Sequence, residues 1–212
     1  MESAKFWRWV RIHLSEENFD EIFSSWRFRS LKNVYFNRKS RPTNTQMATF
    51  FSGLEDCSIT SLYCNWVRLT SVDAQTLAGA VVRMKSIMMI ASDLTLEQQV
   101  AMFTAIVECQ DLKLKRITID CNDLSELDPS LLARAVVRLE DADLFCCRLN
   151  STQVETIMEA IILASERGEL KLRKLNIMRG DITTVSDSTT QQVQRILLLF
   201  LSDLLRNPNS RY

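Results

Sequence analysis

The residues of this sequence that could do chemistry are first of all its thiols. Six cysteines occur, at positions 57, 64, 109, 121, 146 and 147, and no two of them are spaced as Cys-x-x-Cys. Cys121 and Cys146 fall at equivalent positions of two similar segments, and Cys147 adjoins Cys146. Neighbouring thiolates could bind a metal ion or form a redox pair. Because a closed zinc site needs four ligands and no fourth ligand is apparent, we expect no metal site and no cofactor.

Acid–base and phosphate chemistry find little support. His13 is the single histidine, so a Ser–His–Asp or Cys–His arrangement would have to include it. It lies on a predicted strand beside Trp7 and Trp9, where an aromatic-type surface contact is the better interpretation. The four glycines are isolated, so neither a phosphate loop nor a dinucleotide fingerprint exists. We therefore predict that the chain is not an enzyme.

The elements that must position these residues are repeats. Residues 72–84 and 127–139 align with seven of 13 positions identical, at an offset of 55. Gln99-Val100 and Gln153-Val154 recur at nearly the same distance, in helices of a different type. Self-similarity at a fixed period is typical of repeat architectures. Two kinds of unit therefore alternate, and one pair of units is 55 residues long.

A strand motif, L-x-x-L-x-L-x-x-(N/C)-x-L, recurs in the same phase. Five copies start at residues 59, 84, 114, 139 and 172, and weaker copies start at 7 and 31. In the copy that starts at Leu114, Ile117 and Ile119 alternate as in a short strand, Asn122 turns the chain, and Pro129 begins a helix. The motif predicts short parallel strands, each of which carries inward apolar residues.

Apolar residues at helical spacing lie between the strand motifs. Asp73 predicts one helix start, and Ser151 or Thr152 ahead of Glu155 predicts another. Stacked units of this kind bury their apolar stripes in one continuous core. The predicted stripes include Met47, Phe50, Phe51 and Leu54; Leu77 and Val81; Val100, Phe103 and Val107; Leu132 and Val136; and Val154, Ile157 and Ile161.

This pattern resembles the leucine-rich-repeat family, and its alternation of short and long units is similar to the ribonuclease-inhibitor-like subfamily. The resemblance implies an α/β fold, a leucine-rich-repeat solenoid (horseshoe arc) with about seven parallel strands on the concave face and helices on the convex face. It implies a single domain over residues 1–212, with degenerate first units over about 1–57 and an atypical closing unit over about 172–212. In this family the position of Cys147 holds a structural Asn or Cys, which further weakens a metal or redox interpretation.

The motif also predicts which side chains lie on the solvent face of the sheet. If its fourth and sixth positions point into the core, its third, fifth and seventh positions point outward. Aromatic residues gather on the first units, and aspartates gather on the later ones. Exposed aromatics with Met are typical of binding hot spots, although strand propensity alone also favours Tyr and Trp. The predicted contact residues are Trp9, Arg11, His13, Tyr35, Asn37, Tyr63, Asn65, Trp66, Met88, Ile90, Asp120, Asp141, Asp143 and Phe145.

These residues predict a non-enzymatic protein–protein interaction module of adaptor, sensor or inhibitor type. A protein or peptide would bind on the concave sheet face, and the aspartates would attract a basic segment of that partner. Lys plus Arg and Asp plus Glu both number 26, and the basic residues are scattered, so nucleic acid is not an expected partner.

Two alternatives stay open. The architecture also resembles GTPase-activating proteins of the leucine-rich-repeat class, which would need an arginine such as Arg38 or Arg179 at a strand end. A predicted helix over about 193–205 is apolar on more than one stripe, so it either covers the terminal core or forms a homodimer.

The sequence offers no signal for secretion or for the membrane. Its first residues contain no apolar signal-peptide core, and its most apolar run, residues 196–201, is far too short to span a bilayer. We therefore expect no membrane contact, reduced thiols and a cytoplasmic location.

Overall fold

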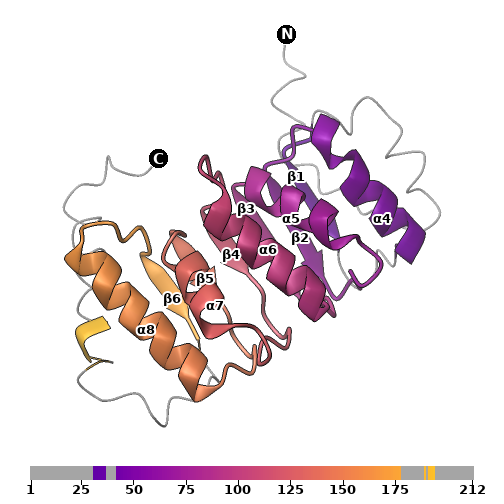
Figure 1. The fold of residues 1–212 in the computed structure, drawn as a ribbon. Coiled ribbons are helices and arrows are strands. Elements are labelled where there is room, and N and C mark those ends of the chain that lie inside the picture. The colour runs from indigo at the N-terminus through magenta and orange to yellow at the C-terminus, as the bar shows by residue number, and fades with distance from the viewer. Residues whose placement is uncertain (1–30, 37–41, 178–188, 190, 194–212) are drawn as a thin grey trace.

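The structure, a computed structural model, describes residues 31–36, 42–177, 189 and 191–193. Within these residues six strands form one parallel sheet whose order follows the chain (Figure 1). The predicted strand over about residues 7–12 lies outside the described residues. The strands are β1 (Asn33–Phe36), β2 (Ser61–Asn65), β3 (Ser86–Ile90), β4 (Arg116–Thr118), β5 (Asp141–Asp143) and β6 (Lys174–Asn176).

Each of the strands β1 to β5 is followed by a helix. In Figure 1 these helices lie side by side in one layer in front of the sheet. The prediction of an α/β fold, with parallel strands joined by helical crossovers, is confirmed. The helices are α4 (Asn44–Ser52), which continues into the 3₁₀ turn η2 (Gly53–Asp56), α5 (Ala74–Arg83), α6 (Leu96–Glu108), α7 (Pro129–Val136) and α8 (Ser151–Glu166).

Strand side chains alternate between the two faces of the sheet, and one face is the core. Ile87, Ile117 and Ala142 stand opposite one another in register, and each is at most 1% exposed. Leu144, just after β5, is also 1% exposed. The motif's fourth and sixth positions therefore point inward as predicted, where they pack against the buried stripes of the helices.

Two kinds of helix start alternate along the chain. α5 and α7 begin after Asp73 and Asp128, whose carboxylates accept a backbone N–H three residues later. The other helices, α4, α6 and α8, begin with capping boxes, in which the cap residue and a glutamine each bond the other's backbone N–H. Their residue pairs are Thr43 with Gln46, Thr95 with Gln98, and Asn150 with Gln153. The two helix starts therefore alternate in step with the two kinds of unit in the sequence.

The predicted helix starts are confirmed, and the cap residue of one helix differs from the prediction. Asp73 is a cap residue, and Pro129 is the first residue of α7, where its missing N–H removes no helical hydrogen bond. The helix start predicted at Ser151 is right, but the cap residue is Asn150 and not Ser151 or Thr152. The Asn150 amide oxygen accepts the Gln153 N–H at 2.9 Å, so the capping hydrogen bond comes from the residue before Ser151.

The stripe predicted for α6 is partly wrong. Val100 is 41% exposed, whereas Gln98 and Gln99 are buried with Met102 and Phe103. Polar side chains can occupy a buried stripe when they are fully hydrogen-bonded. Gln98 meets this condition, because its Nε2 donates to the carbonyls of Leu69 at 2.7 Å and Val72 at 2.6 Å.

The same contact recurs one pair of units later. Gln153 Nε2 donates to the carbonyls of Leu124 and Leu127, each at 2.7 Å. Gln98, and not Gln99, is therefore the structural equivalent of Gln153, and the sequence match was displaced by one residue. A hydrophobic scale cannot find this residue because its role is to satisfy buried carbonyls.

Buried side chains in the turn after each strand also link neighbouring units. Asn122 is 3% exposed, and its Nδ2 donates to the Met89 carbonyl at 2.7 Å. Its Oδ1 accepts the N–H groups of Ser92 at 3.2 Å and Leu94 at 3.4 Å. Ser92 and Cys147 occupy the same position of their own units. The Ser92 hydroxyl donates to the Cys64 carbonyl at 3.0 Å, and the Cys147 thiol donates to the Ile119 carbonyl at 2.7 Å.

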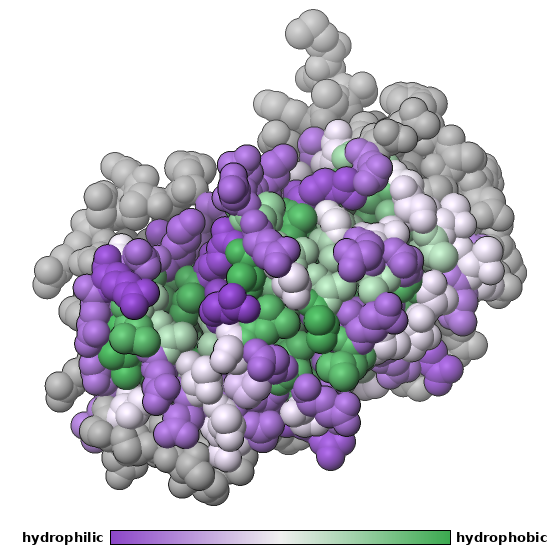
Figure 2. Space-filling model, in the orientation of Figure 1, coloured by the Kyte–Doolittle hydropathy of each residue, from purple (hydrophilic) through white to green (hydrophobic). Residues whose placement is uncertain are grey.

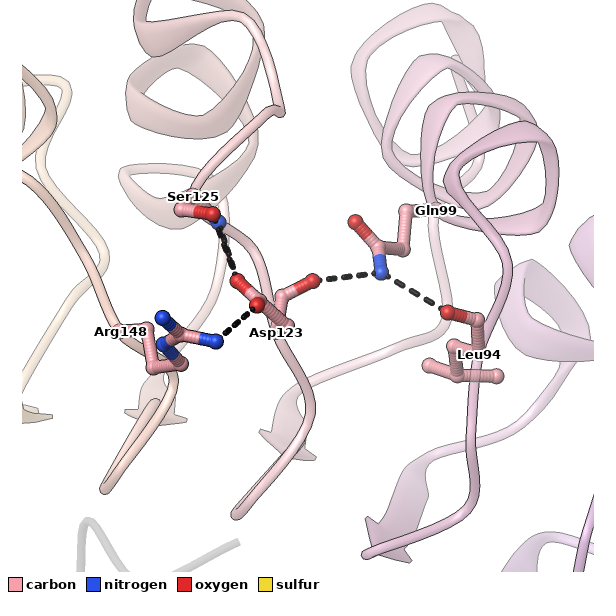
Figure 3. A network of polar contacts seen from close by, with 5 residues as sticks. All are labelled: Leu94, Gln99, Asp123, Ser125 and Arg148. Carbon is pink, nitrogen blue, oxygen red and sulfur yellow. Dashed lines mark hydrogen bonds and ion pairs between the residues drawn. The ribbon is translucent and has the colours of Figure 1, made fainter.

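Asp123 forms polar contacts with two neighbouring segments of the chain, one on each side of its own turn (Figure 3). Its backbone carbonyl accepts from Gln99 Nε2 at 2.8 Å, and that nitrogen also bonds the Leu94 carbonyl. Its carboxylate accepts from the Ser125 hydroxyl at 2.7 Å and pairs with Arg148 at 2.8 Å. Side-chain contacts of this kind link neighbouring units in addition to the apolar packing between them.

Candidate functional site

The sheet face opposite the buried rows displays three rows of side chains. We term it the outer face; it is the face on which the sequence predicts partner binding. The first row is Asn33, Ser61, Ser86, Arg116, Asp141 and Lys174, and the second is Tyr35, Tyr63, Met88, Thr118, Asp143 and Asn176. The third row continues past the strand ends. There Asn65 pairs with Ile90, and main-chain bonds place Asp120 and Phe145 next along it. Ser86 occupies the third motif position, which is predicted to point outward, but it is only 9% exposed.

Aromatic and apolar residues occupy the β1–β3 half of the outer face. Tyr35 and Tyr63 stack with their ring centroids 4.2 Å apart and their planes 5° from parallel. Met88 and Ile90 are half-buried, whereas the sequence led us to expect exposed side chains. Trp66 follows β2 directly and is 63% exposed. Of the predicted apolar contact residues that are described, Trp66 is therefore the one offered most fully to solvent.

The β4–β6 half is charged, but it is not the plain acidic patch that the sequence suggested. Asp141 lies in register between Arg116 and Lys174, and the Lys174 ammonium is 3.9 Å from its carboxylate. Burial raises the pKa of Asp141 above its usual value, while Lys174 and Arg116 act in the opposite direction. Asp143 accepts the Phe145 N–H at 3.3 Å. Positive and negative groups therefore alternate across this half.

The predicted proximity of Cys121 and Cys146 is confirmed, and a third group joins them. The thiols of Cys121 and Cys146 and a carboxylate oxygen of Asp120 all lie within 4.8 Å of one another. A hydrogen bond to Asp120 is the main cause that raises the pKa of the Cys121 thiol to about 11, with smaller contributions from burial and charge repulsion. Asp120 Oδ1 is buried and has no hydrogen-bond partner among the described residues.

Cys147 does not belong to this group. Its thiol points to the Ile119 carbonyl, and burial raises its pKa to about 12. This agrees with the structural role expected at its position. All six cysteines lie among the described residues, and none of them forms a disulfide there.

Several predicted residues cannot be placed. Trp9, Arg11, His13 and Asn37 lie outside the described residues, as do Arg38 and Arg179 of the GTPase-activating hypothesis. The predicted dimer helix, over about 193–205, lies there too, except for Val193.

Sequence reasoning missed that Asp120 belongs with the two thiols. The available signal was its position, since Asp120 directly precedes Cys121 just as Phe145 precedes Cys146.

No protein-family model matches this chain, and a search of curated proteins finds no match either. Within the described part of the chain, every helix is too short or too polar to cross a bilayer.

The helix side carries a second exposed apolar surface. Figure 2 views this side and shows apolar surface gathered over the middle of the helix layer. Leu96 and Val100 are 42% and 41% exposed there, and Leu163 on α8 is 50% exposed. A shallow groove along α6 is lined by Gln75, Leu96, Glu97, Val100, Ala101, Thr104, Ala105 and Glu108. This groove is a competing contact surface, so any test of the outer face must include it.

Proposed function

We propose that this chain is a leucine-rich-repeat module of the ribonuclease-inhibitor-like kind that binds a protein or peptide on its outer sheet face without catalysing a reaction. The sheet order and the alternating helix starts support the repeat assignment, because both continue from unit to unit in step with the sequence motif. A face built from parallel strands holds its side chains at fixed spacing, which suits it to rigid recognition.

The observation that carries the proposal is the aromatic group on β1 and β2. Tyr35 and Tyr63 are already stacked, so little side-chain entropy is lost when a partner packs on them. Trp66 offers a large, 63% exposed apolar surface next to β2. Tyr and Trp are the side chains most often found at the energetic centre of protein interfaces.

The charged half of the outer face would fix the orientation of the partner. Arg116, Asp141 and Lys174 alternate in sign along one row, and Asp143 lies beside them. A partner segment with a basic residue opposite Asp143 and an acidic residue opposite Arg116 would match this pattern. Such complementarity acts mainly on association rate and specificity, and its effect declines with added salt.

The test replaces the aromatic group and compares it with the apolar surface on the helices. In one variant Tyr63→Ala is combined with Trp66→Ala, and in the matched control Leu96→Ala is combined with Val100→Ala. A photo-reactive amino acid at position 63 or 100 identifies the partner that each surface contacts in the native cell. The affinity of the purified partner is then measured by calorimetry with both variants.

We expect the Tyr63/Trp66 variant to bind at least about thirtyfold more weakly, since hot-spot truncations cost about 2 kcal/mol or more. The helix variant should bind like the unmodified chain. The proposal is wrong if cross-links form only from position 100, or if the control loses affinity and the aromatic variant keeps it. Thermal unfolding of both variants shows whether either one has lost its fold.

A further inference from the structure

The sequence led us to expect no metal site because a fourth ligand is missing, but that argument applies only to a closed site. We propose that Asp120, Cys121 and Cys146 form a binding site for Zn²⁺, with a fourth coordination position left open to water or to a ligand. Their three ligand atoms already lie within 4.8 Å of one another. In a tetrahedral zinc site with ordinary Zn–S and Zn–O bonds, neighbouring ligand atoms are about 3.5–3.8 Å apart. Side-chain movements of about 1 Å, without a change of the backbone, would therefore complete the geometry.

The unsatisfied carboxylate oxygen points to a cation. Asp120 Oδ1 is buried without a hydrogen-bond partner in the described part of the chain, and a buried acceptor in this state is costly. A bound divalent ion would satisfy it directly. Asn65 Oδ1, at the equivalent position of an earlier unit, is also buried without a partner, but Trp66 and Ala91 stand where the thiols would be. The thiols therefore distinguish the Asp120 site from its counterpart.

The backbone around the three residues is held from both sides. The Asp120 carbonyl accepts from the Ala91 N–H at 2.9 Å and from Asn122 Nδ2 at 3.1 Å. The Cys121 N–H donates to the Phe145 carbonyl at 3.1 Å, which ties it to the residue before Cys146. Cys121 and Cys146 both have φ of 56°, so the same left-handed turn presents both thiols. Ligands that are positioned in this way need little rearrangement to bind a metal.

Zinc suits this donor set better than Mg²⁺ or Ca²⁺ does. Two thiolates exclude Mg²⁺ and Ca²⁺, which take oxygen ligands, whereas zinc accepts sulfur and carboxylate together. Three protein ligands leave a position open, as in zinc sites that exchange a ligand. The alternative is a disulfide between the two cysteines. It would require a co-reactant such as glutathione disulfide, which would be reduced to two thiols as the Cys121–Cys146 bond forms.

The test is a Zn²⁺ titration of the full chain, kept reduced with a phosphine, in competition with a chromophoric chelator. We expect one zinc ion per chain. Cys121→Ser and Cys146→Ser should each weaken binding by at least about tenfold, and Asp120→Asn should weaken it by about tenfold. Cys57→Ser and Cys109→Ser are the matched controls, because both remove a half-buried thiol away from the site, and they should leave the affinity unchanged.

Co²⁺ provides a second readout that a purely structural role would not affect. A Co²⁺ ion bound by two thiolates gives a sulfur-to-metal charge-transfer band, and each single Cys→Ser variant should lose about half of its intensity. If Cys146→Ser does not fold, Asp120→Asn and the exposed Cys121→Ser carry the test.

Three outcomes would overturn the proposal. The first is the absence of Zn²⁺ binding to the reduced chain. The second is undiminished binding to the Cys121→Ser/Cys146→Ser variant. The third is formation of a Cys121–Cys146 disulfide, detected by mass spectrometry, when the reduced chain is mixed with Zn²⁺ first and with glutathione disulfide afterwards. None of these depends on the proposed protein partner, so the two proposals fail separately.

Discussion

Two successive pairs of units, residues 59–113 and 114–168, share one backbone plan and differ in what they display. The first pair contains β2, α5, β3 and α6, and the second contains β4, α7, β5 and α8. At an offset of 55, Tyr63 corresponds to Thr118 and Met88 corresponds to Asp143. Trp66 likewise corresponds to Cys121. An aromatic surface in one pair thus becomes a charged surface with a thiol cluster in the next.

One contact that holds the units together is the same in both pairs. Gln98 and Gln153 each donate to two carbonyls of the preceding turn, with distances that agree to 0.1 Å. Both glutamines are buried, so residues of the outer face can differ between the two pairs without changing these contacts. This separation allows one fold to present two different chemistries, and the predictions below test it from the inside outward.

The largest effect is expected where the two pairs meet, at Asn122. Its counterpart in the first pair is Val67, so Asn122→Val places the residue of one pair into the other. The change leaves the N–H groups of Ser92 and Leu94 and the Met89 carbonyl without this partner in a buried turn. We expect a loss of about 3 kcal/mol in the free energy of unfolding, measured by urea denaturation.

Ser92→Ala is the control for this change. It removes one hydroxyl that donates to the Cys64 carbonyl, so it should cost only about 1 kcal/mol. If Asn122→Val costs no more than Ser92→Ala, the turn residues do not hold the units together.

The second prediction uses two arginines in identical local sequence, Ala-Val-Val-Arg. Arg138 donates to the carbonyls of Ile106 and Cys109, each at 2.6 Å, and also to that of Val107. It thereby caps the end of α6, where carbonyls lack helical partners. Arg83 instead forms an exposed ion pair with Glu55 at 3.1 Å.

Arg138→Ala should therefore lower the free energy of unfolding by about 2 kcal/mol. Without the charged donor, the partly buried carbonyls at the end of α6 lose their hydrogen-bond partner. Arg83→Ala should change it by no more than about 0.5 kcal/mol. Thermal unfolding of the two variants side by side measures the difference. Equal effects would mean that the cap contributes nothing beyond a surface charge.

These two arginines also show how far sequence reasoning reaches. The inward leucine positions, the parallel sheet and the approach of Cys121 to Cys146 could all be predicted, because each depends on periodicity alone. The different roles of Arg83 and Arg138 could not be predicted, since the local sequences are the same and only the neighbouring helix end differs. The left-handed φ of Trp66, 61°, was equally hidden, because no glycine marks that turn.

The candidate site divides in the same way. The motif phase predicted that Tyr35, Tyr63, Asp141 and Asp143 share one face, and the register agrees. The partial burial of Met88 and the placement of Asp141 between two cations depend on side chains of neighbouring strands. A one-dimensional pattern does not give those contacts, which is why the acidic patch was predicted too simply.

The smallest effect on stability is expected at the exposed Asp123. The pH dependence of this effect identifies the interactions that cause it. Hydrogen bonds from Ser125, and more weakly Arg148, hold the pKa of this carboxyl below its usual value of 3.8. Because the folded-state pKa is lowered, the stabilisation is present above the unfolded pKa and disappears as the pH falls through the folded one.

Asp123→Asn should therefore cost at most about 0.5 kcal/mol at neutral pH and nothing in strong acid, as measured by urea unfolding from pH 7 to pH 2. Ser125→Ala removes the hydroxyl bond, which is the largest single cause of the lowered pKa, and keeps the backbone N–H bond; it should therefore remove more of this pH-dependent difference than Arg148→Ala. The reverse order would show that the ion pair, although 77% and 48% exposed at its two side chains, contributes more than the turn that holds the carboxylate.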